Sequence, residues 1–401
     1  MHRLRDFCNT SYPEEPLYLQ YSITLKVQRF FTTLRSVQND TFGLFGQPRI
    51  QGRSRTYNRT IHVLAVFLFL ILVVVSQAFS QPFTREIETI PVIVYNDTIA
   101  QPFAGGVDAP NHRFVDIDGD NDFDLFIFDA DQNVDFYRNE GTPQQAELKL
   151  RPNELTLPRF TAWFLFVDLN GDATIDFLSD NGGNSISYYP NTGTQQNPVF
   201  TLQDSTMLDT SGSPIINGYI GIPTFADLDG DNDYDFYASN FDGSITLYEN
   251  IGTHVSPSFR YADGRFQGVV IVNDSCLKDG ASAIPGKNAL HGGSILQLAD
   301  INGDSAQDLI MGDLNSQRLF LLPNNGNSNT PLLQCSNESF PPDGSLHTSG
   351  YNQPNLVDID GDDDLDLFIG GFINMGPNNM QRRSFWFYEN IGVASTPIYQ
   401  L

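Results

Sequence analysis

Basic residues are scarce in this sequence. Its 401 residues include 22 Lys and Arg against 48 Asp and Glu, which gives a formal net charge of −26. Such a chain is repelled by nucleic acid phosphates and by anionic membrane surfaces, so the charge argues against both as partners. At this length, the chain forms one large domain or two ordinary ones.

Helical periodicity is also missing. After residue 80, no segment repeats its apolar residues with a helical period, whereas Gly, Asn, Asp, Thr and Phe are plentiful. This composition is typical of many short strands joined by turns. The sequence therefore predicts an all-β fold.

Long hydrophobic runs are absent except for residues 61–79, which follow a basic stretch and precede the small residues of SQAFSQ. The basic residues are Arg53, Arg55 and Arg59. An apolar core of about 15 residues with these flanks is typical of a secretory signal peptide, whereas a membrane-spanning helix needs roughly 20 apolar residues. We predict a signal peptide at 61–80, with an uncleaved single-pass signal anchor as the alternative. Only that anchor would bring the chain to a membrane.

Residues 1–60 show no sustained apolar period of either kind. They are interpreted either as untranslated, with the true start downstream of Met1, or as a cytoplasmic extension. Cleavage near Ser80 would leave 44 acidic and 13 basic residues in a chain of 81–401.

Cysteine is rare, with three in the chain. Removal of the first 80 residues also removes Cys8 and leaves Cys276 with Cys335. An even pair in an exported chain predicts a disulfide between them. Two separate buried thiols are the alternative.

One unit recurs five times after residue 80. Its copies are FVDIDGDNDFDLF from Phe114, FVDLNGDATIDFL from Phe166, FADLDGDNDYDFY from Phe225, LADINGDSAQDLI from Leu298 and LVDIDGDDDLDLF from Leu356. An Asn-x-Gly mark follows the first aspartate of each copy by 23, 23, 23, 24 and 32 residues. Two marks kept in register through five copies identify an internal repeat. Four short strands per unit, separated by turn residues, predict the blade of a β-propeller.

The units resemble FG-GAP (VCBS-type) repeats, which build the N-terminal β-propeller of integrin α-chains. The resemblance rests on the D-x-[DN]-G-D-x-x-x-D core and covers about residues 90–401. It implies a β-propeller of four-stranded blades in 81–401, with six or seven blades when complete. Proteins of this family serve in extracellular adhesion, ligand binding or scaffolding.

Residues 88–97, ETIPVIVYND, look like an outer strand without a preceding unit. Such a strand would close a ring by joining inner strands from the far end of the chain, and those inner strands are missing. We infer a truncated chain or unrecognised blades; a simple lead-in segment is the alternative.

The aspartate-rich cores predict metal loops at 116–124, 168–176, 227–235, 300–308 and 358–366. Counting the first aspartate as position 1, positions 1, 5 and 9 are always Asp, position 3 is Asp or Asn, and position 4 is Gly. Position 7 varies, so it is expected to bind through its backbone carbonyl. The predicted ligands are Asp116, Asp118, Asp120, Asp122 and Asp124; Asp168, Asn170, Asp172, Thr174 and Asp176; Asp227, Asp229, Asp231, Asp233 and Asp235; Asp300, Asn302, Asp304, Ala306 and Asp308; and Asp358, Asp360, Asp362, Asp364 and Asp366.

Hard oxygen ligands in this number suit Ca²⁺ better than Mg²⁺, and the lack of Cys and His in the loops disfavours Zn²⁺ and Cu. An EF-hand would have Gly at position 6, Glu at position 12 and a following helix, and these loops have none of the three. We predict up to five structural Ca²⁺ ions. The two loops with Asn170 and Asn302 carry less charge and are expected to bind more weakly.

No catalytic motif of the GxSxG or HExxH type occurs, and four histidines follow residue 80: His112, His254, His291 and His347. We expect surface histidines rather than catalytic bases, and we expect most strand aromatics to be core. The favoured function is therefore an exported, calcium-stabilised module that binds a protein or polysaccharide through loops such as 262–297 and 371–383. A polysaccharide hydrolase or lyase, or an accessory domain of one, is the alternative.

Overall fold

The structure is a computed structural model. Its regular elements are mainly short antiparallel strands. It describes residues 92–94, 97–99, 107, 110–129, 132–218, 221–272, 275–278, 294–336, 338–342, 346, 348, 350–371 and 384–401. The predicted extension 1–60 and signal peptide 61–80 lie outside the described residues. Among those residues, the one helical element is the single 3₁₀ turn η1 (Phe266–Gly268). The predicted all-β class is confirmed.

Each repeat forms one blade, and its strands pair in the order in which they follow along the chain. The first blade contains β3 (Asn111–Val115), β4 (Asp124–Phe128), β5 (Val134–Asn139) and β6 (Leu148–Leu150). The second contains β7 (Phe164–Val167), β8 (Asp176–Asp180) and β9 (Ile186–Tyr189), and the third contains β10 (Thr224–Ala226), β11 (Asp235–Ser239), β12 (Ile245–Asn250) and β13 (Phe259–Asp263). The fourth contains β16 (Ser294–Ala299), β17 (Asp308–Asp313) and β18 (Phe320–Leu322), and the fifth contains β19 (Gln353–Val357), β20 (Asp366–Gly370), β21 (Phe385–Asn390) and β22 (Tyr399–Gln400).

The outer strands of the second and fourth blades are reduced to single bridges. These bridges join Asn191 to Phe200 and Asn324 to Leu333, at the position that a fourth strand occupies in the other blades. The pattern of four strands per repeat is therefore retained in all five units.

The second strand of every blade is buried along its whole length, because the neighbouring blades cover both of its faces. In the first and fifth blades, the residues that follow the leading aspartate are accordingly apolar on both faces, as in DLFIF and DLFIG. Most of the apolar clusters draw their residues from two adjacent blades. The hydrophobic effect therefore holds the blades to one another as well as within themselves.

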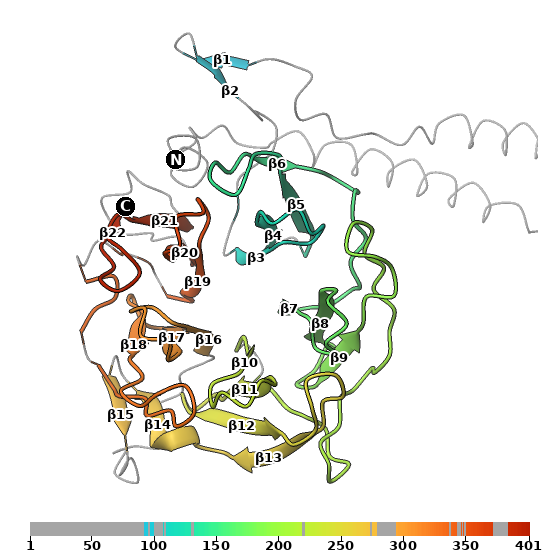
Figure 1. Ribbon diagram of the computed structural model, residues 1–401, viewed down its shortest axis with the longest axis vertical. Helices are drawn as coiled ribbons and strands as arrows, with labels where there is room; N and C mark the ends of the chain where they lie inside the picture. The colour runs from blue at the N-terminus through green and yellow to red at the C-terminus, as the bar shows by residue number, and fades with distance from the viewer. Residues whose placement is uncertain are drawn as a thin grey trace, which may run out of the picture. The chain divides into compact units, whose positions relative to one another are not determined.

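Five blades form the ring, so the expectation of six or seven was wrong (Figure 1). The fifth blade packs directly against the first, with the inner strands β19 and β3 in contact. At this junction the rings of Phe114 and Phe368 lie 4.4 Å apart between centroids, and the hydroxyl of Ser384 donates a hydrogen bond to the Val107 carbonyl. Side-chain packing therefore closes the ring without a further blade.

The inference of missing inner strands was also wrong. Part of the segment 88–97 forms β1 (Val92–Val94), which pairs with β2 (Asp97–Ile99) as a separate two-stranded sheet. The outer position of the fifth blade is already taken by β22, which pairs with β21. All strands of each blade thus come from one repeat. Among the described strands, none from one end of the chain pairs into the blade at the other end.

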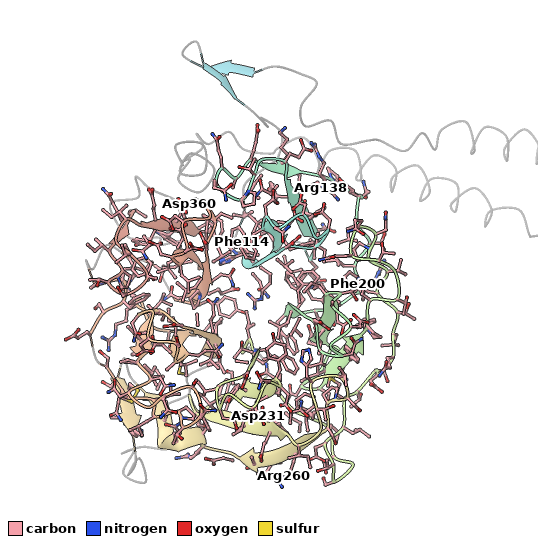
Figure 2. The ribbon with its side chains drawn as sticks, in the orientation of Figure 1. Phe114, Arg138, Phe200, Asp231, Arg260 and Asp360 are labelled. Carbon is pink, nitrogen blue, oxygen red and sulfur yellow. A yellow bond between two sulfur atoms is a disulfide. The ribbon has the colours of Figure 1, made fainter. Side chains whose placement is uncertain are left out.

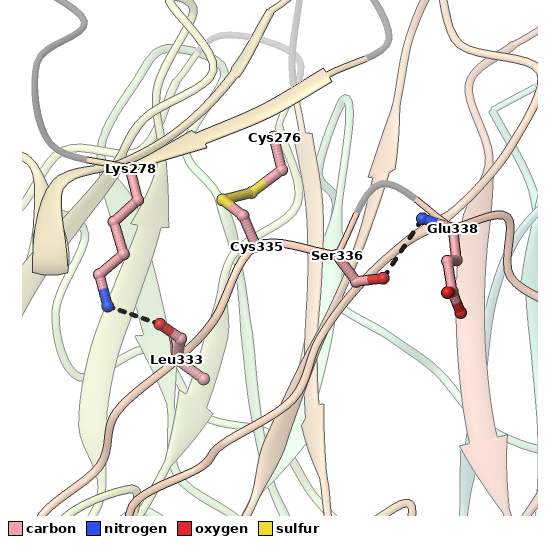
Figure 3. The surroundings of a disulfide bond; sticks show 6 residues. All are labelled: Cys276, Lys278, Leu333, Cys335, Ser336 and Glu338. Atoms are coloured by element: carbon pink, nitrogen blue, oxygen red, sulfur yellow. Dashed lines mark hydrogen bonds between the residues drawn. A yellow bond between two sulfur atoms is a disulfide. The ribbon is translucent and has the colours of Figure 1, made fainter.

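A hairpin between the third and fourth blades carries the disulfide. The hairpin consists of β14 (Val269–Val272) and β15 (Ser275–Lys278), and Cys276 on β15 is bonded to Cys335 beyond the fourth blade's outer bridge (Figure 3). Lys278 Nζ donates a hydrogen bond to the Leu333 carbonyl at 2.7 Å beside it. The hairpin is therefore fastened to the outside of the fourth blade.

Removal of this disulfide is expected to lower the stability of the folded chain. The two cysteines are 59 residues apart in sequence, and closing a loop of that length contributes roughly 4 kcal/mol in the chain-entropy model. The double substitution Cys276→Ala and Cys335→Ala should lower the melting temperature by roughly 10 °C. A reductant should have the same effect on the wild type and none on the variant, and equal melting of all samples would contradict the prediction.

Candidate metal sites

Each predicted metal loop connects the first and second strands of its blade, so the five loops occupy equivalent places around the ring. Figure 2 shows two of them through Asp231 in the third blade and Asp360 in the fifth. In every loop the backbone enters the left-handed region twice, at positions 4 and 6, with φ between 65° and 76°. The residues are Gly119 and Asn121, Gly171 and Ala173, Gly230 and Asn232, Gly303 and Ser305, and Gly361 and Asp363. Glycine at position 4 has no Cβ to oppose this conformation.

The aspartate at position 1 accepts hydrogen bonds from the backbone of its own loop. In the first loop, Asp116 Oδ1 accepts the N–H of Gly119 at 2.6 Å, and Oδ2 accepts the N–H of Asn121 at 3.0 Å. The N–H groups of positions 5 and 6 donate to the first aspartate in all five loops. This residue therefore shapes the turn around which the other carboxylates gather.

The aspartate at position 9 links the loop to the Asn-x-Gly turn of the same blade. Its Oδ1 accepts the N–H of the turn asparagine at 2.7 to 2.8 Å in all five blades. The side chain of that asparagine in turn accepts the N–H groups of the glycine and of a residue across the turn, as Asn139 does from Gly141 and Glu147. The sequence analysis missed this role, although the constant spacing of the two marks was its signal.

Three of the five loops gather carboxylates closely enough to share an ion. One oxygen from each of positions 1, 3 and 5 lies within 4.8 Å of the others in the first, third and fifth loops. The residues are Asp116, Asp118 and Asp120; Asp227, Asp229 and Asp231; and Asp358, Asp360 and Asp362. In the part of the chain that the structure describes, the second and fourth loops form no such group.

The same three loops contain buried carboxylate oxygens with no hydrogen-bond partner. They are Asp118 Oδ1, Asp122 Oδ1 and Asp124 Oδ2 in the first loop, Asp229 Oδ1 and Asp233 Oδ1 in the third, and Asp364 Oδ1 and Asp366 Oδ2 in the fifth. A buried carboxylate without a partner is costly, and coordination of a cation is one of the few ways to offset that cost.

Burial and mutual repulsion raise carboxyl pKa values in these loops. Burial raises the pKa of Asp124 to about 7 and that of Asp366 to about 8. Burial, reinforced by the neighbouring aspartates, raises the pKa of Asp233 and of Asp364 to about 6. A cationic side chain offsets part of this charge in the first loop, where Arg138 pairs with Asp118 at 2.7 Å. Without an added cation, the folded protein therefore disfavours full ionisation of these loops.

The second and fourth loops leave no buried carboxylate oxygen without a partner, although Gln307 Oε1 in the fourth loop is buried without one. Asn170 Oδ1 accepts the N–H of Asp172 at 3.0 Å, and Asn302 makes the equivalent bond in the fourth loop. Asp176 accepts hydrogen bonds from the Tyr188 hydroxyl and from the N–H groups of Asn191 and Leu169. The replacement of a carboxylate by an amide at position 3 thus turns a possible ligand into a bond within the loop.

Position 7 differs between the two kinds of loop. Asp122, Asp233 and Asp364 each carry one of the partnerless buried oxygens described above. Thr174 instead bonds to Asp172, and Ala306 is buried. Ligation through the backbone carbonyl at position 7 stays a prediction.

Each loop is also in contact with the Asn-x-Gly turn of the next blade. A Cβ built on Gly119 would lie 2.2 Å from the Gln195 side chain, and one on Gly230 would lie 2.5 Å from the Ser328 carbonyl oxygen. The loops at Gly171, Gly303 and Gly361 meet the turns at His254 and Val255, at Ala394 and Ser395, and at Pro143 and Gln144. The last of these turns belongs to the first blade, so the contacts run around the whole ring. No sequence signal revealed them.

The two histidines that the structure describes differ in burial, and both tryptophans are buried. His112 is fully buried, and its ring lies 4.7 Å from that of Phe385 between the first and fifth blades, which corrects its expected surface position. His254 is exposed, as expected, in the turn against the second loop. Trp163 and Trp386 are core residues, as expected. The residues His291 and His347 lie outside the described residues, as do 273–274 and 279–293 of the loop 262–297 and all of 371–383 except residue 371.

Comparison with known proteins gives one family match. Residues 116–179, which include the first two loops, match the family described as FG-GAP-like repeat. No curated protein matches the sequence.

Two solved structures are similar in part. A lectin of Agrocybe aegerita, solved for its recognition of non-reducing terminal N-acetylglucosamine, shares 18% identity over 75% of this chain and 69% of that chain, with a TM-score of 0.36. BBS1N in complex with ARL6DN shares 14% identity over 71% of this chain and 95% of that chain, with a TM-score of 0.30.

Proposed function

Because this chain is a five-bladed propeller of FG-GAP repeats, a fold of binding and scaffold modules, we propose that it is an exported module stabilised by Ca²⁺ that binds an extracellular protein or polysaccharide. The observation that carries the calcium assignment is the set of partnerless buried carboxylate oxygens in the first, third and fifth loops. Repeated three times in equivalent places, they form a donor set that a cation would satisfy.

The donor chemistry fits Ca²⁺. Each of the three loops offers carboxylate oxygens from positions 1, 3, 5, 7 and 9, all hard ligands on a flexible loop. Ca²⁺ accepts six to eight such oxygens, whereas Mg²⁺ requires a stricter octahedral arrangement. A bound ion would supply positive charge to the carboxylates, and the residues of the loop would hold it between two strands of one blade.

The contacts between loops and turns suggest what ion binding does for the ring. Each loop lies against the turn of the next blade, so a loop ordered by an ion presents a fixed surface to its neighbour. Calcium therefore stabilises the junctions between blades as well as the loops themselves. Binding energy of this kind adds to folding stability because the site does not exist in the unfolded chain.

Export is supported by the disulfide between Cys276 and Cys335, a bond that persists mainly in oxidising compartments. In the described residues, no helix is long and apolar enough to cross a membrane. The signal peptide at 61–80 remains a prediction from sequence.

Calcium titration of residues 81–401 during thermal unfolding tests the proposal. We expect a melting temperature that rises strongly with Ca²⁺, falls in EDTA and responds weakly to Mg²⁺, since each site at about 100 times its Kd adds about 2.7 kcal/mol. A folded protein with the same melting temperature in Ca²⁺ and in EDTA would contradict the metal assignment.

Calcium counting by equilibrium dialysis should resolve two classes of site. We expect three tighter ions in the first, third and fifth loops, because the other two loops leave no buried carboxylate oxygen without a partner. The triple substitution Asp118→Asn, Asp229→Asn and Asp360→Asn should remove the tight class. Five equivalent sites in the wild type would show that position 3 does not control affinity.

Ligand binding is tested separately, with glycan arrays and capture from extracellular matrix or cell surfaces. The calcium-loaded protein should bind a definable ligand, and the EDTA-treated protein should bind it less well. Failure of the loaded protein to bind any glycan or protein would leave a purely structural role and contradict this part of the proposal.

A further inference from the structure

The residue directly before the turn asparagine varies with the kind of loop beside it. In blade order it is Arg138, Pro190, Glu249, Pro323 and Glu389. Proline occurs in the two blades whose loop has asparagine at position 3, and a charged residue occurs in the three blades whose loop gathers carboxylates. The hydrogen bond from the turn asparagine to position 9 keeps this residue next to the loop of its own blade. The pattern therefore indicates a role at the metal sites.

Arg138 of β5 (Figure 2) is held beside the first loop by two carboxylates. Its Nη1 donates to Asp118 Oδ2 at 2.7 Å, and its Nη2 lies 2.9 Å from Glu154 Oε1. Its guanidinium carbon also lies 5.9 Å from the centre of the Phe136 ring. The side chain of Asp118 is only 12% exposed, so water screens this ion pair less than it screens a surface pair. The first loop thus receives positive charge from the protein itself.

At the same place, the third and fifth blades have a glutamate, Glu249 or Glu389. Burial is the main reason that the pKa of the aspartate at position 3 is raised in all three loops. The charge of Arg138 opposes this rise in the first loop, whereas the charges of the two glutamates add to it in the other two loops. Glu249 also pairs with Arg260 on the neighbouring strand. The residue before the turn asparagine thus brings opposite charges to otherwise similar loops.

We propose that the residue before the turn asparagine sets how strongly each of the three loops depends on Ca²⁺, an inference that rests on the proposed metal sites. The Ca²⁺ affinity of such a loop rises with the number of its ligand charges. Arg138 neutralises one carboxylate of the first loop and repels a second cation, whereas Glu249 and Glu389 add negative charge beside the third and fifth loops. The first loop should therefore bind Ca²⁺ the most weakly of the three and lose the least stability when Ca²⁺ is removed.

The same contacts have a second interpretation with the opposite sign. Arg138 occupies Asp118 Oδ2 and leaves the buried Oδ1 without a hydrogen-bond partner. If the arginine served mainly to orient Oδ1 towards an ion, its removal would weaken binding, as the loss of an outer partner does at other metal sites. We favour the effect of charge, because the third and fifth loops gather the same three carboxylates without an arginine at this place.

Equilibrium dialysis of the full chain with radioactive Ca²⁺ measures the sign. In a chain that carries Asp229→Asn and Asp360→Asn, the first loop is the one of the three that keeps all its carboxylates. Adding Arg138→Gln should raise its Ca²⁺ affinity about tenfold, because a unit charge roughly 7 Å from a divalent ion changes binding by about that factor even in water. Arg265→Gln is the matched control, since Arg265 is an exposed arginine paired with Asp242, outside the loops. It should leave the affinity unchanged.

The reciprocal change tests the fifth loop. In a chain that carries Asp118→Asn and Asp229→Asn, Glu389→Arg gives the fifth blade the residue that the first blade has at this place. It should lower the Ca²⁺ affinity of the fifth loop at least tenfold, since it replaces a negative charge by a positive one. This measurement gives a result even where Arg138→Gln fails to fold.

Thermal unfolding measures how far stability depends on the ion. The increase in melting temperature from EDTA to saturating Ca²⁺ should be larger in Arg138→Gln than in the wild type, and Arg265→Gln should match the wild type. Absence of Ca²⁺ binding by the wild type would overturn the metal sites themselves. The role of Arg138 alone is overturned if the wild type binds Ca²⁺ but Arg138→Gln binds it no more tightly than Arg265→Gln does, or if Glu389→Arg leaves the fifth loop unchanged.

Discussion

The Asp366→Asn variant is expected to be more stable than the wild type in EDTA and less stable in saturating Ca²⁺. Asp366 is almost completely buried, and burial raises its pKa from 3.8 to about 8. Its Oδ1 accepts the Asn390 N–H, a bond that an asparagine side chain also makes. The substitution therefore removes the charge and keeps the link to the turn.

The pH dependence follows from the direction of this shift. A carboxyl whose pKa is higher in the folded state binds its proton more tightly there, so its contribution to stability is complete below about pH 4 and is lost as pH rises towards 8. In EDTA, the wild type should therefore lose several kcal/mol between pH 4 and pH 8, at about 1.4 kcal/mol for each unit of pKa shift. Asp366→Asn should lose less over the same range.

Calcium should reverse the effect of the substitution, because a bound ion favours the ionised carboxylate and protons compete with the ion. Urea unfolding at pH 5 and pH 8, each in EDTA and in Ca²⁺, measures all four conditions. Asp363→Asn is the matched control: it removes a charge from the same loop at position 6, where Asn121 and Asn232 already occur. Destabilisation by Asp366→Asn in EDTA would contradict the prediction.

Asp360→Asn should open the junction between the first and fifth blades. This junction is the one place in the ring that the chain does not cross, and the fifth loop supports it through contact with the turn at Pro143 and Gln144. The second loop shows that asparagine at position 3 preserves the turn, so the variant should weaken ion binding without unfolding the loop. Elsewhere in the ring, the connecting chain limits how far two blades can separate.

Hydrogen exchange measured by mass spectrometry distinguishes these cases. In limiting Ca²⁺, we expect amides of β3 and β19 to exchange at least tenfold faster in Asp360→Asn, which corresponds to about 1.4 kcal/mol. The matched variant Asp229→Asn changes the same position of the third loop, at a junction that the chain crosses. It should leave β3 and β19 protected. Equal exchange in both variants would show that the fifth loop has no special role in closing the ring.

The sequence by itself determined the repeat unit, the strand class and the places of the five loops. These features are local, because alternation of apolar residues, turn glycines and aspartate spacing act over a few residues. The spacing of the Asn-x-Gly mark also contained the link from position 9 to the turn, as Asp124 and Asn139 show. The reason for this spacing is the hydrogen bond from the Asn139 N–H to Asp124, which only the structure shows.

The tertiary structure alone decided the number of blades, because closure depends on how blade faces such as those of Phe114 and Phe368 pack, and not on how many motifs can be counted. It also separated three loops with partnerless buried carboxylate oxygens from two without them, and it placed His112 against Phe385 between the first and fifth blades. Burial and hydrogen-bond partners are supplied by residues far apart in the chain. The sequence alone therefore does not show whether a charged side chain will have a partner in the folded protein.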